Sequence, residues 1–104
     1  MLTAKQIDSI ITTIVEGYQP QKLLLFGSYA SGTPNDDSDL DLLIIKQTDT
    51  PYTKRPAEVR NLFPKSPCAM DLIILTPEEF ELTKDKKSMI PYIAITQGKM
   101  IYEA

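Results

Sequence analysis

Apolar and polar positions at the start of the chain recur with the period of a helix. Thr3 and Gln6 have the spacing of a capping box, which satisfies free backbone N–H groups at a helix start. Gly17 and Pro20 predict where this helix ends. The apolar residues between them lie on one face: Ile7, Ile10, Ile11, Ile14 and Val15. We therefore expect an amphipathic helix that packs on a core.

Three short apolar runs are typical of buried strands. Leu40–Ile45 is interrupted only by Asp41 and is apolar on both faces, so it should lie centrally in a sheet. The other runs are Leu23–Phe26, which ends at Gly27, and Leu72–Leu75, which follows Met70 and Asp71.

Loops, helices and a last strand connect and follow these runs. Gly27 to Asp39 is rich in Gly, Ser, Thr, Pro, Asn and Asp, which predicts a loop with one helical turn from Ser28. Thr76, Pro77 and Glu79 have the pattern of a capped helix start. The remaining predictions are a helix over Tyr52–Phe63 that buries Val59, Leu62 and Phe63 and whose limits Pro51, Pro56 and Pro64 leave open, a helix over Ser88–Gln97 with Pro91 in its first turn and Gly98 as its stop, and a strand over Lys99–Glu103.

The connections between strands predict the topology. About 26 residues separate Ile45 from Asp71, which is enough for a helical crossover between parallel strands. The first strand can return antiparallel to the second through the loop. We expect an α/β (α+β) fold with a small mixed sheet of about four strands flanked by helices. The end of the first strand and the starts of the next two then share one edge of the sheet.

Length and composition limit what this fold can do. The chain has 104 residues, 42% of them hydrophobic and 24% charged, which predicts one ordinary globular domain over residues 1–104. No apolar run approaches the roughly 20 residues that span a bilayer, so we expect no membrane association and a cytoplasmic location. The net charge of −3 argues against direct nucleic-acid binding through a basic surface.

The rare residue types exclude several kinds of catalysis. One cysteine, Cys68, excludes an internal disulfide and a cysteine-cluster metal site, and we expect it to be a small buried filler. The chain contains no histidine, which excludes the Ser-His-Asp and Cys-His arrangements and the usual zinc ligand. Any catalysis must therefore use carboxylates and hydroxyls.

Three acids and a Gly-Ser pair are the candidate residues of a functional site. Asp39 and Asp41 are two apart on a strand, so their side chains leave the same face and can converge on a divalent cation. Asp71 stands at the head of the next apolar strand, on the shared edge. Gly27 lets a phosphate approach the backbone, and Ser28 adds a hydroxyl at a helix start. The alternatives are a solvated acidic turn for Asp39 and Asp41, a surface acid for Asp71, and an ordinary turn for the Gly-Ser pair.

The segment from Gly27 to Asp41, GSYASGTPNDDSDLD, resembles the signature of the DNA polymerase beta-like nucleotidyltransferase superfamily. That signature is a Gly-Ser pair, ten residues and then Asp-x-Asp; Ala30 and Gly32 match residues often seen inside it. The first helix, the acid at Asp71 and the closing strand also fit, so the resemblance covers nearly the whole chain. Its size, without an appended helical domain, is similar to the minimal nucleotidyltransferase (MNT) branch.

The resemblance implies a specific activity. Members of that branch commonly pair with a HEPN protein, which implies that this chain is the antitoxin and that the HEPN partner is an RNase toxin. The implied reaction transfers AMP from ATP to a tyrosine of the toxin. Asp39, Asp41 and Asp71 would be catalytic and would hold two magnesium ions. Gly27 and Ser28 would hold the β and γ phosphates.

Two other functions stay open at this point. One is an antitoxin that masks its toxin by binding, with an idle active site, and the other is a nucleotidyltransferase that acts on a small molecule or nucleic acid. Six further side chains are able to reach phosphates or an acidic partner, but a solvated surface position is the favoured interpretation for each: Lys22, Tyr29, Lys54, Arg55, Arg60 and Lys65.

Overall fold

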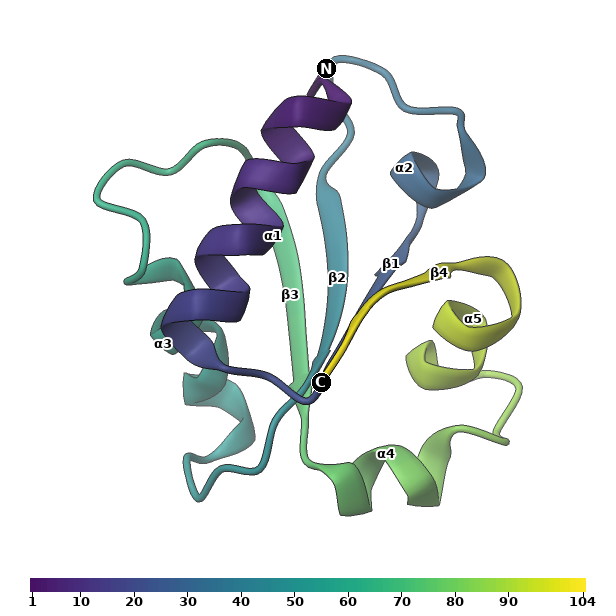
Figure 1. Ribbon diagram of the computed structural model, residues 1–104. Coiled ribbons are helices and arrows are strands. Elements are labelled where there is room, and N and C mark those ends of the chain that lie inside the picture. The colour runs from purple at the N-terminus through teal and green to yellow at the C-terminus, as the bar shows by residue number, and fades with distance from the viewer.

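The computed structural model describes residues 1–104 and contains a four-stranded mixed sheet flanked by helices (Figure 1). The strands are β1 (Lys22–Phe26), β2 (Leu40–Ile45), β3 (Met70–Leu75) and β4 (Lys99–Glu103), and their order in the sheet is β3-β2-β1-β4. β2 pairs parallel with β3 and antiparallel with β1. The predicted fold class and topology are confirmed.

Both predicted capping boxes are present. The Thr3 hydroxyl accepts a hydrogen bond from the Gln6 N–H at 3.1 Å and begins α1 (Ala4–Tyr18). The Thr76 hydroxyl accepts one from the Glu79 N–H at 3.2 Å and begins α4 (Pro77–Thr83). The other helices are α2 (Ser28–Ser31), the 3₁₀ turn η1 (Tyr52–Lys54), α3 (Arg55–Arg60) and α5 (Ile90–Gln97). No helix has both the length and the hydropathy to cross a bilayer.

The prediction of one helix over Tyr52–Phe63 was wrong. The segment divides into η1 and α3, and α3 ends at Arg60. Pro56 has no N–H to donate to the Tyr52 carbonyl, so that carbonyl accepts from the Arg55 N–H instead and the turn closes as a 3₁₀ helix. Similarly, α5 begins at Ile90 and not at Ser88: Met89 has an extended backbone and is the N-cap, and Pro91 is the second residue of the helix.

The core lies on both faces of the sheet. On one face, Ile10 and Ile14 of α1 and Val59 of α3 pack on the even-numbered residues of β2. On the other face, Phe80 of α4 and Ala94 of α5 pack on Leu43 and Ile45. Each cluster excludes water from one side of β2, which is why this strand is apolar throughout except at Asp41.

Arg55 is buried, which corrects the expectation of a solvated side chain. Its guanidinium donates to the Thr50 carbonyl at 2.8 Å, to the Ile74 carbonyl at 3.0 Å and to the Glu79 carboxylate at 2.6 Å. Arg60, from the same helix, donates to the Met70 carbonyl at 3.0 Å. The two arginines therefore occupy backbone acceptors along the outer strand of the sheet, β3.

Two further expectations need correction. Tyr29 is half-buried against the α1 side of the core, and its hydroxyl accepts a hydrogen bond from the Leu2 N–H at 3.0 Å. Cys68 is half-buried and not a fully buried filler.

Candidate active site

Gly27 lies where β1 ends and α2 begins, and its backbone has a conformation that only glycine adopts readily. Its φ of +72° and ψ of −156° fall in a region that L side chains rarely adopt. A Cβ at this position would overlap Oδ2 of Asp41 and would lie 2.9 Å from its carboxylate carbon. The missing side chain therefore brings the Gly27 backbone directly against the Asp41 carboxylate.

Asp41 and Asp71 occupy opposite positions on the parallel strands β2 and β3. Paired residues on adjacent strands lie about 4.8 Å apart and point to the same face. On the other side of Asp41, its partner on β1 is Phe26, the residue before Gly27. Strand order therefore lines up Gly27, Asp41 and Asp71 across one end of the sheet, on the face that α4 and α5 cover further along (Figure 1).

Asp39 and Ser28 flank this line. Asp39 is exposed and precedes β2 by one residue, and its negative charge reaches Asp41. Ser28 is the first residue of α2, where backbone N–H groups have no partner within the helix, and its hydroxyl makes no hydrogen bond in the structure. The structure thus brings together Gly27, Ser28, Asp41 and Asp71, with Asp39 at the rim.

The negative charges of the three acids are not neutralised by any basic side chain of the protein. Burial, and then the charges of Asp71 and Asp39, raise the pKa of Asp41 above its ordinary value. None of the three carboxylates takes part in any of the salt bridges of the protein. Like charges that crowd a half-buried site disfavour ionisation unless a cation joins them.

Carboxylate oxygens are the ligands that magnesium prefers, so the chemistry of this donor set fits a divalent cation. In the conformation of the structure, however, no three acidic or cysteine side chains converge closely enough to form a ready three-ligand group. The closest relation is between Asp41 and Asp71, which the register of β2 and β3 sets. A cation that all three acids share would require their side chains to turn toward one another.

Sequence interpretation missed one neighbour of the site, Cys68. Burial, and then the charge of Asp39, raise the pKa of its thiol, so the two side chains are close. The register of β2 and β3 explains the proximity, because the Leu40 N–H donates to the Ala69 carbonyl at 3.0 Å. The signal was available only once those strands were paired in the correct register.

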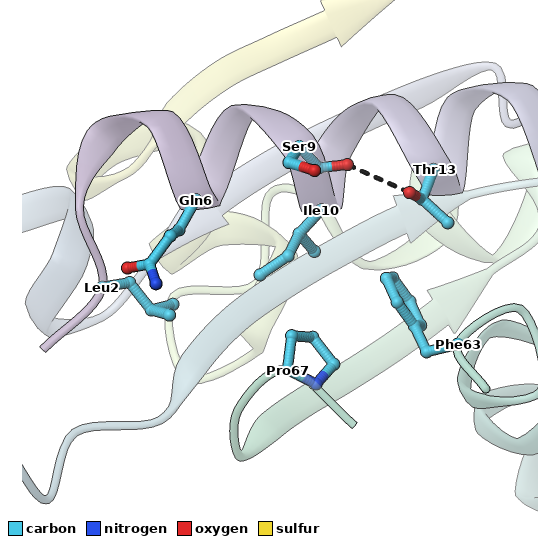
Figure 2. Close-up of a pocket in the computed structure, with 7 residues that line it drawn as sticks. All are labelled: Leu2, Gln6, Ser9, Ile10, Thr13, Phe63 and Pro67. Carbon is cyan, nitrogen blue, oxygen red and sulfur yellow. Dashed lines mark hydrogen bonds between the residues drawn. The ribbon is translucent and has the colours of Figure 1, made fainter. Parts of the chain in front are cut away.

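Two hollows border the first residues of α1 and lie on its side of the sheet. A polar one of about 510 Å³ reaches Asp39 and also touches Asp36, Ser38, Tyr29 and Cys68. The other, of about 200 Å³, is drawn in Figure 2 and contains no acid. Its lining residues come from the N-terminal segment and α1 on one side and from the segment after α3 on the other: Leu2, Gln6, Ser9, Ile10, Thr13, Phe63 and Pro67. The smaller hollow therefore has no part in the acid site.

A comparison with protein families finds one match over most of the chain. The family model described as "Polymerase beta, Nucleotidyltransferase" matches residues 8–104, which include all five candidate residues. No curated protein matches the chain.

Two solved structures have a similar fold. A crystal structure of a mutant of the toxin-antitoxin MntA-HpeT matches 93% of this chain and 73% of its own chain at 20% identity, with a TM-score of 0.66. A putative nucleotidyltransferase from Sulfolobus solfataricus matches 95% of this chain and 78% of its own at 18% identity, with a TM-score of 0.63. At these identities the likeness shows the arrangement of the sheet and helices.

Proposed function

This chain belongs to the polymerase beta nucleotidyltransferase family, and from that premise we propose that it transfers AMP from ATP to a hydroxyl of a partner protein. The partner is a HEPN-family RNase toxin, the acceptor is a tyrosine, and this chain is the antitoxin. The observation that carries the proposal is the line of Gly27, Asp41 and Asp71 across one end of the sheet.

The candidate residues have different roles in the proposed reaction. The open backbone at Gly27 and the free hydroxyl of Ser28 bind the β and γ phosphates at the β1 end of the line. Asp39, Asp41 and Asp71 would hold magnesium, which when bound neutralises phosphate charge and lowers the pKa of the acceptor hydroxyl. Asp71 orients that hydroxyl from the β3 end and takes its proton.

The transfer is an in-line displacement at the α-phosphorus. The acceptor oxygen forms a bond to the α-phosphorus while the bond from that phosphorus to the bridging oxygen of the β-phosphate breaks. Pyrophosphate leaves toward Gly27 and Ser28, and the acceptor proton leaves toward Asp71. Because Asp41 lies between these two ends, its carboxylate is next to the reacting phosphoryl group.

The toxin partner is supported by the fold likeness to the toxin-antitoxin MntA-HpeT. The crowded negative charges disfavour an antitoxin that only masks its partner. A half-buried carboxylate without a cation lowers the stability of the fold, and binding by masking does not need it. A small-molecule acceptor remains the second alternative, which label on a tyrosine of the partner protein would contradict.

The test incubates the chain with α-labelled ATP, Mg²⁺ and the protein encoded beside it. We expect label on a tyrosine of that partner, reduced at least about 100-fold by Asp41→Asn or Asp71→Asn. Asp49→Asn, an exposed acid outside the site, is the matched control and should label normally. Neutralisation of the partner without label, to the same extent by wild type and both site variants, would establish masking instead.

A further inference from the structure

A third hollow lies along β3, on the other face of the sheet, and is mostly apolar. Its volume is about 350 Å³, within the range of roughly 300–1,000 Å³ that is usual for binding pockets. Two of its walls are exposed apolar side chains, Met89 at 40% and Tyr52 at 51%. The main lining residues come from η1, β3 and the start of α5: Tyr52, Ile73, Leu75, Met89, Ile90 and Pro91. We call this hollow the β3 groove.

The β3 groove begins at Ile73, the next residue after Asp71 on the same face of β3. Asp71, Ile73 and Leu75 alternate with Leu72 and Ile74 and therefore lie on the same face of β3. Successive residues on one face of a strand are about 6.6 Å apart. A molecule in the groove thus has one end close to Asp71, where the acceptor hydroxyl is needed.

The direction of attack assigns the groove to the acceptor. In-line displacement requires the acceptor to approach from the side opposite the leaving pyrophosphate. Gly27 and Ser28 hold the pyrophosphate at the β1 side of Asp41, so the acceptor enters over β3. We propose that the β3 groove binds an apolar segment of the acceptor protein and delivers its hydroxyl to Asp71. This inference rests on the proposed function and adds to it the surface that selects the substrate.

The charges beside the groove indicate what else the segment carries. Lys54 follows Tyr52 by two residues, and Lys86 and Lys87 directly precede the lining residues Ser88 and Met89. All three lysines are exposed, and none takes part in a salt bridge. Asp85 offsets one of these charges, and the carboxylate of the lining residue Glu79 is paired with Arg55, so the net charge of the rim is positive. The segment that fits is therefore apolar around its hydroxyl residue and acidic at its flanks.

The β3 groove binds the segment through side-chain contacts and not by adding a strand to the sheet. An extended segment that adds to a sheet edge needs free backbone groups on that edge. On β3 the Met70 and Ile74 carbonyls already accept hydrogen bonds from Arg60 and Arg55. The groove lies on the face of the strand and needs neither carbonyl.

The experiment records backbone amide shifts of the ¹⁵N-labelled full chain by NMR. The first probe is Mg²⁺ with a non-hydrolysable ATP analogue, and the second, added to that complex, is the acetylated peptide Asp-Leu-Tyr-Leu-Asp. We expect the nucleotide to shift Gly27 and Ser28 and the peptide to shift Ile73, Leu75 and Ile90. The same peptide with lysines in place of its aspartates should bind at least about fivefold more weakly.

Variants of exposed residues make the result specific. Met89→Gln, which removes the apolar contact without adding charge, should weaken peptide binding by about fivefold or more without changing the nucleotide shifts, whereas Met89→Leu should bind as wild type. Leu82→Gln, which makes the same apolar-to-polar change at an exposed α4 residue outside the groove, is the matched control and should bind as wild type.

Two failures are distinguishable. Absence of nucleotide shifts at Gly27 and Ser28 contradicts the proposed function itself. Peptide shifts outside the groove, equal binding by Met89→Gln and Leu82→Gln, or nucleotide shifts centred on Ile73 and Leu75 would each overturn the docking inference while leaving nucleotide binding at the acid site intact. The last of these outcomes would mean that the groove holds the nucleobase.

Discussion

At the scale of single residues, Gly27 couples the end of β1 to the acid on β2. Gly32, a few residues later in the same loop, also has a positive φ, of +79°, but a Cβ there would meet no atom within 4 Å. Both glycines have a positive φ, but Gly32 is in the ordinary left-handed region, whereas Gly27 has a ψ of −156° and is the only one of the two that approaches the Asp41 carboxylate.

This contrast gives a prediction for two alanine variants. We expect Gly32→Ala to lower the free energy of unfolding by about 1 kcal/mol, the usual cost of a left-handed residue with a side chain. Gly27→Ala should cost about 2–3 kcal/mol, because the new methyl also displaces Asp41. Urea denaturation measures both, and only Gly27→Ala should lose AMP transfer. Equal costs for the two variants would contradict the contact.

Residue patterns predict where the acids and the Gly-Ser pair lie in the fold, because their spacing and the alternation of β2 decide their positions locally. Arg55 shows what such patterns cannot predict. Its burial depends on the Ile74 carbonyl and on Glu79, which are 19 and 24 residues away in sequence. No local rule distinguishes this arginine from a solvated one, so the contact appears only when η1, β3 and α4 are assembled.

At the scale of elements, Glu79 connects two of them. Its carboxylate accepts from the Thr76 N–H at 2.8 Å and so caps α4, and it also pairs with Arg55 of α3. The hydrogen bond from Arg55, and then the one from the Thr76 backbone, lower the pKa of Glu79 below its ordinary value. A depressed pKa in the folded state means that the stabilisation is complete above the unfolded pKa and is lost as pH falls through the folded one.

We therefore predict that part of the acid-induced loss of stability belongs to this pair. Glu79→Gln keeps the capping ability and should cost about 1 kcal/mol at neutral pH, a discounted value because the Glu79 side chain is 40% exposed. Its cost should shrink as pH falls from about 7 to about 3. Urea titrations across that range measure it, with the exposed neighbour Glu78→Gln as control. A pH-independent cost would exclude the ionised pair as its source.

Strands and capped helix starts could be predicted because hydrophobic period and cap spacing are local properties. The limits of α3 and α5 could not be predicted to the residue. Pro56 and Pro91 are each compatible with several positions in the first turn of a helix. The residue at which the helix begins therefore depends on which backbone N–H groups replace the missing proline donor. Tertiary contacts such as those of Arg55 decide between these positions.

At the scale of the whole molecule, nucleotide binding should be visible as stability. A ligand present at 100 times its dissociation constant adds about 2.7 kcal/mol, which in a chain of this size raises the melting temperature by about 10 °C. We expect this shift with Mg²⁺ and ATP together, and its reversal by EDTA. Calorimetry or a fluorescence melt measures it.

Asp41→Asn should abolish that shift, and without ligand it should be at least as stable as wild type. The reason is that burial and the charges of Asp71 and Asp39 disfavour the Asp41 carboxylate in the folded state. Asp49→Asn should melt and respond like wild type. A clear loss of ligand-free stability in Asp41→Asn would show that the carboxylate is a structural group.

The hydrogen bonds from Arg55 and Arg60 to the outer strand β3 have a consequence in concentrated solutions. Bare edges are templates on which identical chains polymerise into fibrils. On β3, guanidinium groups already occupy the acceptors of Met70 and Ile74, and they must dissociate before a second molecule can dock there. The opposite border of the sheet, β4, carries Lys99 and Glu103 at its two ends. Arg55 and Arg60 therefore obstruct fibrillar growth at the β3 border.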